Sequence, residues 1–252
     1  YWQNKLQGEI SLLNLPFDYP FALTSNNNQE FFTVIYYSEL FNEIKQLSQK
    51  LLPEIKIEQS LSLILFATLQ IFLYRYTAPE ENIIGTFVNL NHTDFSQTIA
   101  NFLNQIIIKG NISGNSTFKD VLKAVTQEVK ETLENQDYPF ELLVEKLLKQ
   151  RDLSRPPFVQ VLLDFPLREV NNEVKSLFIP NITNKQVNLG NLTLENYDID
   201  QNSLQNWDLY LQVFNTDESL IINWHYNWDL FKSETIQRMI ANFQVLLEGI
   251  LA

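Results

Sequence analysis

The sequence predicts an α/β domain in which a mixed β-sheet is packed with helices. Helical and strand patterns alternate early in the chain, and the later part is rich in strands. Hydrophobic residues make up 45% of the 252 residues, which is enough for a substantial core. We therefore expect a single domain over residues 1–252.

The N-terminal segments alternate between helix and extended chain. A short helix is expected at residues 1–8, followed by a connector that carries Pro16 and Pro20. Aromatic and β-branched side chains over residues 30–37 predict a strand. Ser38 precedes apolar residues at helical spacing, which predicts a helix that Ser38 caps.

The most apolar segment, residues 58–76, predicts a helix that is buried on most sides. Two short apolar runs, residues 82–88 and 99–108, predict strands on either side of a polar loop. Thr117 is expected to cap a helix over residues 118–134.

Prolines punctuate the middle of the chain. Pro139 is expected in the first turn of a helix that Asp137 caps. Adjacent prolines at 156 and 157 force the chain out of helix and lead into a strand at residues 158–165. Residues 167–191 contain many loop-forming residues and predict no regular element.

The last part of the chain predicts a β-hairpin and a closing helix. Residues 192–199 form an expected strand, and residues 205–214 and 220–228 form the two arms of a hairpin. Ser233 is expected to cap a helix over residues 234–251, which has one apolar face.

Composition excludes several classes of protein. The net charge of −12 argues against nucleic-acid binding, which needs a basic face. Cysteine is absent, so disulfides and cysteine–metal sites are excluded and a cytoplasmic location is expected. No membrane partner is expected, because no uninterrupted apolar run reaches the length of a span. A start at Tyr1, without Met, indicates a piece of a longer protein.

Catalytic residues are scarce. The histidines are His92, in a polar loop near Asp94, and His225, in a hairpin strand. Neither has a nucleophile or an acidic cluster nearby in the sequence, so both are interpreted as structural or surface residues and no metal site is expected.

Nine segments, in order along the chain, resemble motifs of the C-terminal lobe of nonribosomal peptide synthetase condensation domains. The clearest are Asn-Gln-Asp-Tyr-Pro-Phe-Glu at 135–141 and Arg-Asp-Leu-Ser-Arg-Pro-Pro-Phe at 151–158. The others lie at 1–8, 15–20, 73–77, 84–86, 101–104, 207–209 and 226–231.

This resemblance implies a chloramphenicol-acetyltransferase-like fold of two lobes with an active-site tunnel between them. The family joins aminoacyl or peptidyl thioesters that are carried on phosphopantetheine arms of separate carrier domains. Its His-His-x-x-x-Asp-Gly motif belongs to the N-terminal lobe, and this sequence has no His-His pair. We therefore assign no catalytic residue and no cofactor to the chain, which would be a C-terminal lobe lacking its N-terminal partner.

Two positions bear on function through the same resemblance. Asn91 stands where the family usually has an arginine that pairs with the aspartate of the missing motif, and an amide cannot replace a guanidinium in an ion pair. Asn104 occupies a position that lies near the family's substrate channel. It can equally be a strand amide with purely structural hydrogen bonds.

The remaining motif residues are interpreted as architectural. Asp137, Pro139, Phe140 and Glu141 are suited to starting and packing a helix. An ion-pair network in the following loop is expected from Arg151, Asp152 and Arg155.

Two hypotheses follow. The chain is either a noncatalytic half-domain that serves as a platform for an adjacent adenylation domain, or one half of an active condensation domain. Asn91 favours the platform. In both cases the expected partners are the adenylation and carrier domains of the same synthetase.

Overall fold

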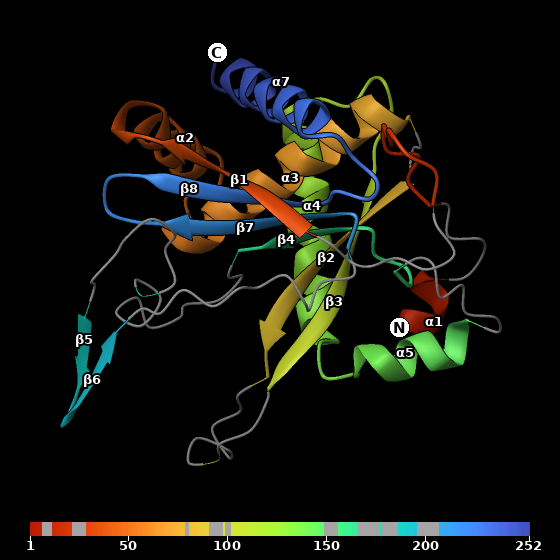
Figure 1. Cartoon of the computed structure of the whole chain (residues 1–252), viewed down its shortest axis with the longest axis horizontal. Coiled ribbons are helices and arrows are strands. Elements are labelled where there is room, and N and C mark those ends of the chain that lie inside the picture. Colours follow the sequence, from red (N-terminus) through yellow and green to blue (C-terminus); the bar gives the residue numbers. More distant parts are fainter. Residues whose placement is uncertain are drawn as a thin grey trace.

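A computed structural model describes residues 1–6, 12–21, 29–78, 81–90, 98, 102–148, 156–165, 177, 186–195 and 207–252. The elements in chain order are α1 (Trp2–Lys5), β1 (Gln29–Tyr36), α2 (Ser38–Leu51), α3 (Ile57–Thr77), β2 (Glu81–Asn89), β3 (Leu103–Asn111), α4 (Phe118–Glu134), α5 (Phe140–Leu147), β4 (Val161–Asp164), β5 (Gln186–Leu189), β6 (Leu192–Glu195), β7 (Leu209–Asn215), β8 (Leu220–Asn227) and α7 (Ser233–Leu251) (Figure 1). The predicted alternation of helices and strands early in the chain is confirmed.

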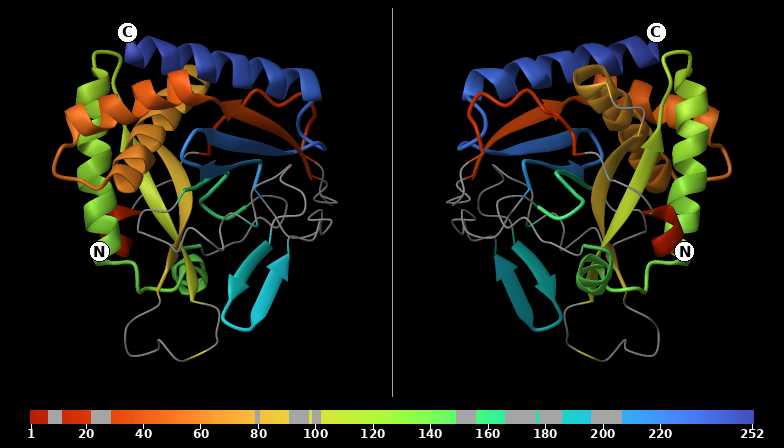
Figure 2. Two further views of the ribbon diagram at one scale, coloured as in Figure 1. Left: turned by 90° about the vertical axis from the view of Figure 1, so that its left-hand side faces the viewer. Right: turned by 90° about the vertical axis from the view of Figure 1, so that its right-hand side faces the viewer.

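The main sheet has six strands in the order β1-β8-β7-β4-β2-β3. It is mixed, because β4 runs parallel to both β2 and β7 while the other neighbours are antiparallel. Helices α2, α3, α4 and α7 cover one face (Figure 2). The strands β5 and β6 form a separate two-stranded sheet. The predicted mixed α/β class is confirmed.

The centre of the helical layer is α3, which is apolar all round and packs against α2, α4 and α7. Among the described residues it is the one helix long and apolar enough to cross a membrane, although 72% of its most apolar window is buried inside the fold. A helix buried on all sides by other elements must be apolar all round. Its composition is thus explained by its place in the core.

The starts of α2, α4 and α7 can be compared with the predicted caps. Thr117 caps α4 as expected: its side chain accepts a hydrogen bond from the backbone N–H of Asp120, whose carboxylate accepts one from the Thr117 N–H. The predictions for Ser38 and Ser233 are wrong. Each is the first residue inside its helix, with no side-chain capping bond at the preceding N-cap residue. A hydroxyl caps from the N-cap position, and both serines lie one residue too far along.

The observed strand boundaries differ from the predicted ones for local reasons. The strand β3 begins at Leu103 and continues to Asn111, later than predicted. The strand β4 begins at Val161, because Phe158 has φ +61° and cannot continue a ladder. The short strand β5 was missed within the segment interpreted as loop. It pairs with β6 across a turn in which Gly190 has φ +61°, a conformation that glycine adopts without strain.

Candidate functional site

The most clearly defined site that contains predicted motif residues lies where β3 begins, beside the start of α5. Asn104 is 6% exposed, and its side chain makes three hydrogen bonds to one loop. Its Nδ2 donates to the carbonyl oxygens of Gln136, at 2.7 Å, and Tyr138, at 2.9 Å. Its Oδ1 accepts from the backbone N–H of Phe140 at 3.0 Å. Both amide hydrogens and the amide oxygen are therefore engaged in holding this loop.

Asn104 also supplies the start of α5 with a hydrogen-bond acceptor. Pro139 is the N-cap residue, with extended backbone, and Phe140 is the first helical residue. The helix therefore starts one residue later than predicted. The Phe140 N–H is one of the donors that a helix leaves free at its start, and here Asn104 satisfies it from a neighbouring strand.

The four residues of the motif at the start of α5 have distinct environments. Phe140 is buried in the core at 8% exposure. Asp137 and Glu141 are exposed, and Glu141 lies in the first turn, where a carboxylate is favoured by the helix dipole. Asp137 precedes the N-cap position by two residues. Asp137 was predicted to be the N-cap residue, and this prediction is wrong because Pro139 holds the N-cap position.

A groove of about 650 Å³ flanks this loop. It is lined by the N-terminal residue, α1, the end of α4, the loop that follows it and α5: Tyr1, Trp2, Gln3, Glu134, Asn135, Asp137, Tyr138, Leu143, Lys146 and Leu147. The lining is mixed in charge. Hydrogen bonding to Tyr138 raises the pKa of Lys146, so this amine stays protonated. At the edge of the groove, Trp2 of α1 donates a hydrogen bond from Nε1 to the carbonyl oxygen of Asn135, at the end of α4, at 3.0 Å.

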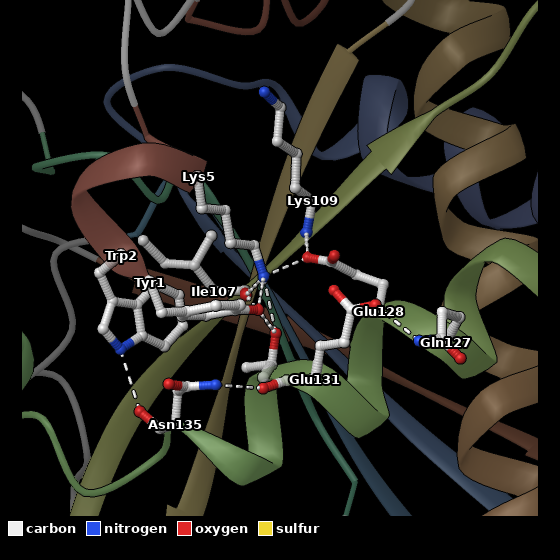
Figure 3. Close-up of polar contacts among 10 residues, drawn as sticks. Tyr1, Trp2, Lys5, Ile107, Lys109, Gln127, Glu128, Glu131 and Asn135 are labelled. Atoms are coloured by element: carbon white, nitrogen blue, oxygen red, sulfur yellow. Dashed lines mark hydrogen bonds and ion pairs between the residues drawn. The ribbon is translucent and has the colours of Figure 1, made fainter.

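Behind the groove, Lys5 joins α1 to α4 and to the outer edge of β3 (Figure 3). Its ammonium group pairs closely with Glu128 and donates to Thr132 Oγ1 at 2.7 Å. It also donates to the Ile107 carbonyl oxygen at 3.3 Å, and the Lys109 N–H donates to Glu128 at 2.8 Å. The Lys5–Glu128 pair thus forms hydrogen bonds with backbone groups on the outer side of β3, which would otherwise be free to pair with another chain.

A second feature lies on the sheet face away from the helices. Trp224 contacts Phe72 of α3 and Phe243 of α7, so its neighbour His225 points to the opposite face. There His225 lies between Phe31, with ring centroids 5.0 Å apart, and Tyr210, at 5.1 Å.

The row of rings continues across the sheet. Tyr210 lies 5.5 Å from Trp207, and Trp207 lies 5.7 Å from Phe87 of β2. Tyr210 also donates from its hydroxyl to Asp164 at 3.0 Å. We call Phe31, His225, Tyr210, Trp207 and Phe87 the aromatic row. Sequence reasoning missed it, since its members come from several strands and a loop.

His225 is a packed strand residue, one of the structural roles expected from the sequence. It is 7% exposed, and burial lowers its pKa to about 4, so the imidazole is neutral at pH 7. Its Nε2 has no hydrogen-bond partner among the described residues. His92 lies outside the described residues.

Several predicted site residues cannot be placed. Asn91, Arg151, Asp152 and Arg155 lie outside the described residues, so the missing ion pair and the loop network stay predictions. The substrate-channel role of Asn104 also stays a prediction. Within the described ranges, no group of three or more His, Cys, Asp or Glu could hold a metal ion. The described residues provide the structural hydrogen bonds of Asn104 and the aromatic row on the sheet face away from the helices.

Comparison with known proteins gives a consistent family. The whole chain, residues 1–252, matches the condensation-domain family. It is 30% identical to a linear gramicidin synthase of Brevibacillus parabrevis over 254 residues, covering 100% of the chain and 5% of that protein. It is 28% identical to gramicidin S synthase 2 of Brevibacillus brevis over 251 residues, covering 99% of the chain and 5% of that protein.

Solved structures show the same fold. A four-domain nonribosomal peptide synthetase bound to AMP and glycine superposes with a TM-score of 0.82 at 20% identity, over 99% of this chain and 19% of that one. The X-domain from teicoplanin biosynthesis superposes with a TM-score of 0.75 at 21% identity, over 99% of this chain and 53% of that one. The chain thus spans about 5% of the length of the curated relatives named above and about half of the X-domain. Because the family match covers every residue and the fold is chloramphenicol-acetyltransferase-like, this chain belongs to the condensation-domain family of nonribosomal peptide synthetases.

Proposed function

We propose that the chain is the C-terminal lobe of a condensation domain and serves as a noncatalytic platform for an adjacent adenylation domain. The arrangement around Asn104 carries this proposal. Both of its amide hydrogens are donated, and its amide oxygen accepts the Phe140 N–H, all within the loop that starts α5. A residue that holds architecture in this way has no free hydrogen left for a substrate.

The histidine environment supports the same conclusion. A general base must lie within hydrogen-bond reach of the group that it deprotonates. His225 is buried, neutral and flanked by the rings of Phe31 and Tyr210. At Asn91 the sequence has an amide where the family usually has a cation, which would weaken pairing with a catalytic lobe.

The alternative is that the chain is half of an active condensation domain, which joins carrier-bound aminoacyl thioesters. The half-length match to the X-domain fits this alternative as well as it fits the platform, because both make the chain one lobe of a two-lobed fold. A half-length match is what one lobe of a two-lobed enzyme would give. The aromatic row, on the face without helices, would then be a surface for packing or for substrate.

Deleting residues 1–252 from the parent synthetase separates the two proposals. A platform predicts that the adenylation domain melts at a lower temperature and activates its amino acid more slowly, measured by ATP–pyrophosphate exchange. Half of an active condensation domain predicts unchanged adenylation and complete loss of amide-bond formation at this step. Unchanged melting temperature and exchange rate in the deletion protein would contradict the platform.

A further inference from the structure

The strand β1 forms one end of the six-stranded sheet (Figure 1). On one side it pairs with β8 over all eight of its residues, from Gln29 with Asn227 to Tyr36 with Leu220. None of the strands that the structure describes pairs with its other side. This outer side is therefore a row of backbone groups with strand geometry.

The register shows which backbone groups point outward. The Asn227 N–H donates to the Asp208 carbonyl oxygen at 3.2 Å, so the backbone of Asn227 faces β7 rather than β1. In antiparallel pairs the direction of these groups alternates along the strand. The backbone N–H and C=O groups of Phe31, Thr33 and Ile35 consequently point away from the sheet.

The strand β1 itself lacks three of the features that usually protect a sheet edge. Edge strands are commonly blunted by lysine, proline or a bulge. The strand reads Gln-Glu-Phe-Phe-Thr-Val-Ile-Tyr, and its register with β8 is uninterrupted. Its one charged residue, Glu30, accepts a hydrogen bond from the Tyr226 hydroxyl at 2.6 Å. Beside it, Phe31 is 53% exposed, Ile35 36% and Tyr37 69%.

A groove of about 420 Å³ lies at the end of this strand. It is lined by Val34, Ile35, Tyr36, Tyr37, Glu39, Leu40, Glu43, Gln244 and Glu248. Three of these are carboxylates, from α2 and α7, and no lysine or arginine is among the described lining residues. The groove therefore combines apolar walls with negative charge.

Tyr36 provides an independent sign that a polar group is missing here. It lines the groove, is 4% exposed, and its hydroxyl has no hydrogen-bond partner in the described part of the chain. Burial, together with the nearby Glu248 carboxylate, raises the pKa of Tyr36, so the hydroxyl keeps its proton. Buried polar groups without a partner are uncommon, and a hydrogen-bonding ligand would satisfy this one.

We infer that the outer edge of β1 binds an extended segment of a partner polypeptide as an added strand, and that a lysine or arginine of this segment enters the groove. Main-chain hydrogen bonds to Phe31, Thr33 and Ile35 would supply affinity, as in other cases of strand addition. The carboxylates of Glu39, Glu43 and Glu248 would select the cation. A second copy of the chain fits poorly, because it would bring together two acidic grooves on chains of net charge −12. The inference holds whether or not the lobe is part of a catalytic domain.

The test is a peptide titration followed by fluorescence anisotropy. The probe is labelled acetyl-Thr-Val-Thr-Val-Arg-Val-Thr-amide, and the matched peptide carries Glu in place of Arg. We expect the Arg peptide to bind at least about tenfold more tightly, with affinity falling as salt rises from about 50 to about 500 mM. Equal binding of the two peptides, or no binding of either, overturns the inference.

Variants of the chain locate the binding. Thr33→Pro removes an outward N–H without removing a bond to β8, so binding should fall about tenfold or more. Thr33→Val is the matched control, since it also loses the hydroxyl bond to Asn223 but keeps the N–H and should bind normally. Glu43→Gln with Glu248→Gln should remove the preference for Arg, whereas Glu54→Gln, outside the groove, should not.

Two outcomes would decide against the inference, and a folding failure would not. Undiminished binding to a folded Thr33→Pro variant would exclude the edge of β1. If that variant does not fold, the Glu43→Gln/Glu248→Gln protein keeps the test decisive, because both side chains are exposed. A dimer in sedimentation that Thr33→Pro dissociates would assign the edge to a second copy and overturn the basic-segment proposal.

Discussion

The side chain of Asn104 holds the backbone of Phe140, 36 residues later in the chain, at the start of α5. The same amide donates to two carbonyl oxygens of the preceding loop, at Gln136 and Tyr138. Helix α5 is therefore positioned from the sheet rather than by a capping residue of its own. This makes Asn104 a residue whose structural role can be measured separately from any contact with substrate.

Replacing Asn104 with Ala should destabilise the protein by about 2–4 kcal/mol. The change removes the Asn104 partner of three backbone groups, two of them in buried hydrogen bonds, and each buried unpaired group costs about 1–3 kcal/mol, partly offset by entering water. Urea unfolding followed by circular dichroism measures the loss. Asn111→Ala, at the exposed far end of the same strand, is the control and should cost less than about 0.5 kcal/mol. Equal effects of the two changes would show that the Asn104 bonds contribute little.

Lys5→Met should also be strongly destabilising, by about 3 kcal/mol, because it leaves the Glu128 carboxylate with only 18% exposure and no cation. The double variant Lys5→Met/Glu128→Gln should be more stable than Lys5→Met alone, since it removes the uncompensated charge. A double-mutant cycle in urea tests this. Strictly additive effects would argue that the pair is not coupled.

Protonation of His225 should make the protein less stable in mild acid. Its pKa is about 4 in the folded protein, against about 6.5 when unfolded, so the unfolded state binds the proton first. The contribution of neutral His225 to the free energy of unfolding is fully present above pH 6.5 and is lost as the pH falls toward 4. The difference of about 2.5 pH units, at about 1.36 kcal/mol each, gives about 3 kcal/mol.

The comparison for this prediction is His225→Phe, which keeps a ring between Phe31 and Tyr210 but cannot be protonated. The stability of both proteins is measured from pH 4 to pH 7.5. All other side chains are the same in the two proteins, so the difference between the two curves isolates His225. Parallel curves would mean that His225 is already satisfied or protonated in the folded protein.

Gly85→Ala should destabilise the sheet by about 1–3 kcal/mol through overpacking. A Cβ at this position would lie 2.5 Å from Cγ1 of Val159 and 3.2 Å from Nε2 of Gln105. Val159→Ala should restore part of the loss in the double variant, because it removes the clashing methyl group. Gly249→Ala, in a helix with no atom within 4 Å of the new Cβ, is expected to stabilise by up to about 1 kcal/mol. Failure of Val159→Ala to rescue would place the strain elsewhere.

Regular elements with strong periodicity could be predicted from the sequence, and special backbone conformations could not. The helix α4 runs from Phe118 to Glu134 as predicted, because its apolar period and the Thr117–Asp120 capping box agree. The strand β5 was missed because four residues between turns carry little pattern. The late start of β4 follows from the positive φ of Phe158, which side-chain type does not predict.

The candidate site was predictable as a set of motifs but not as a set of contacts. Asn104 and the residues from Asp137 to Glu141 were recognisable, yet the hydrogen bonds between them join β3 to a loop that follows helix α4. The Lys5–Glu128 pair spans 123 positions and gave no local signal beyond a lysine in a short N-terminal helix. The aromatic row depends on strand register, which follows only once the order of the strands is known.

We propose that this chain supports its neighbours without taking part in bond formation. The most direct measurement is amide-bond formation between aminoacyl thioesters on the carrier domains that flank it in the intact parent synthetase, followed by mass spectrometry of the carrier-bound product. The platform predicts no dipeptide at this step while both carriers remain loaded. A dipeptide that forms with the intact synthetase and disappears when residues 1–252 are deleted would contradict it.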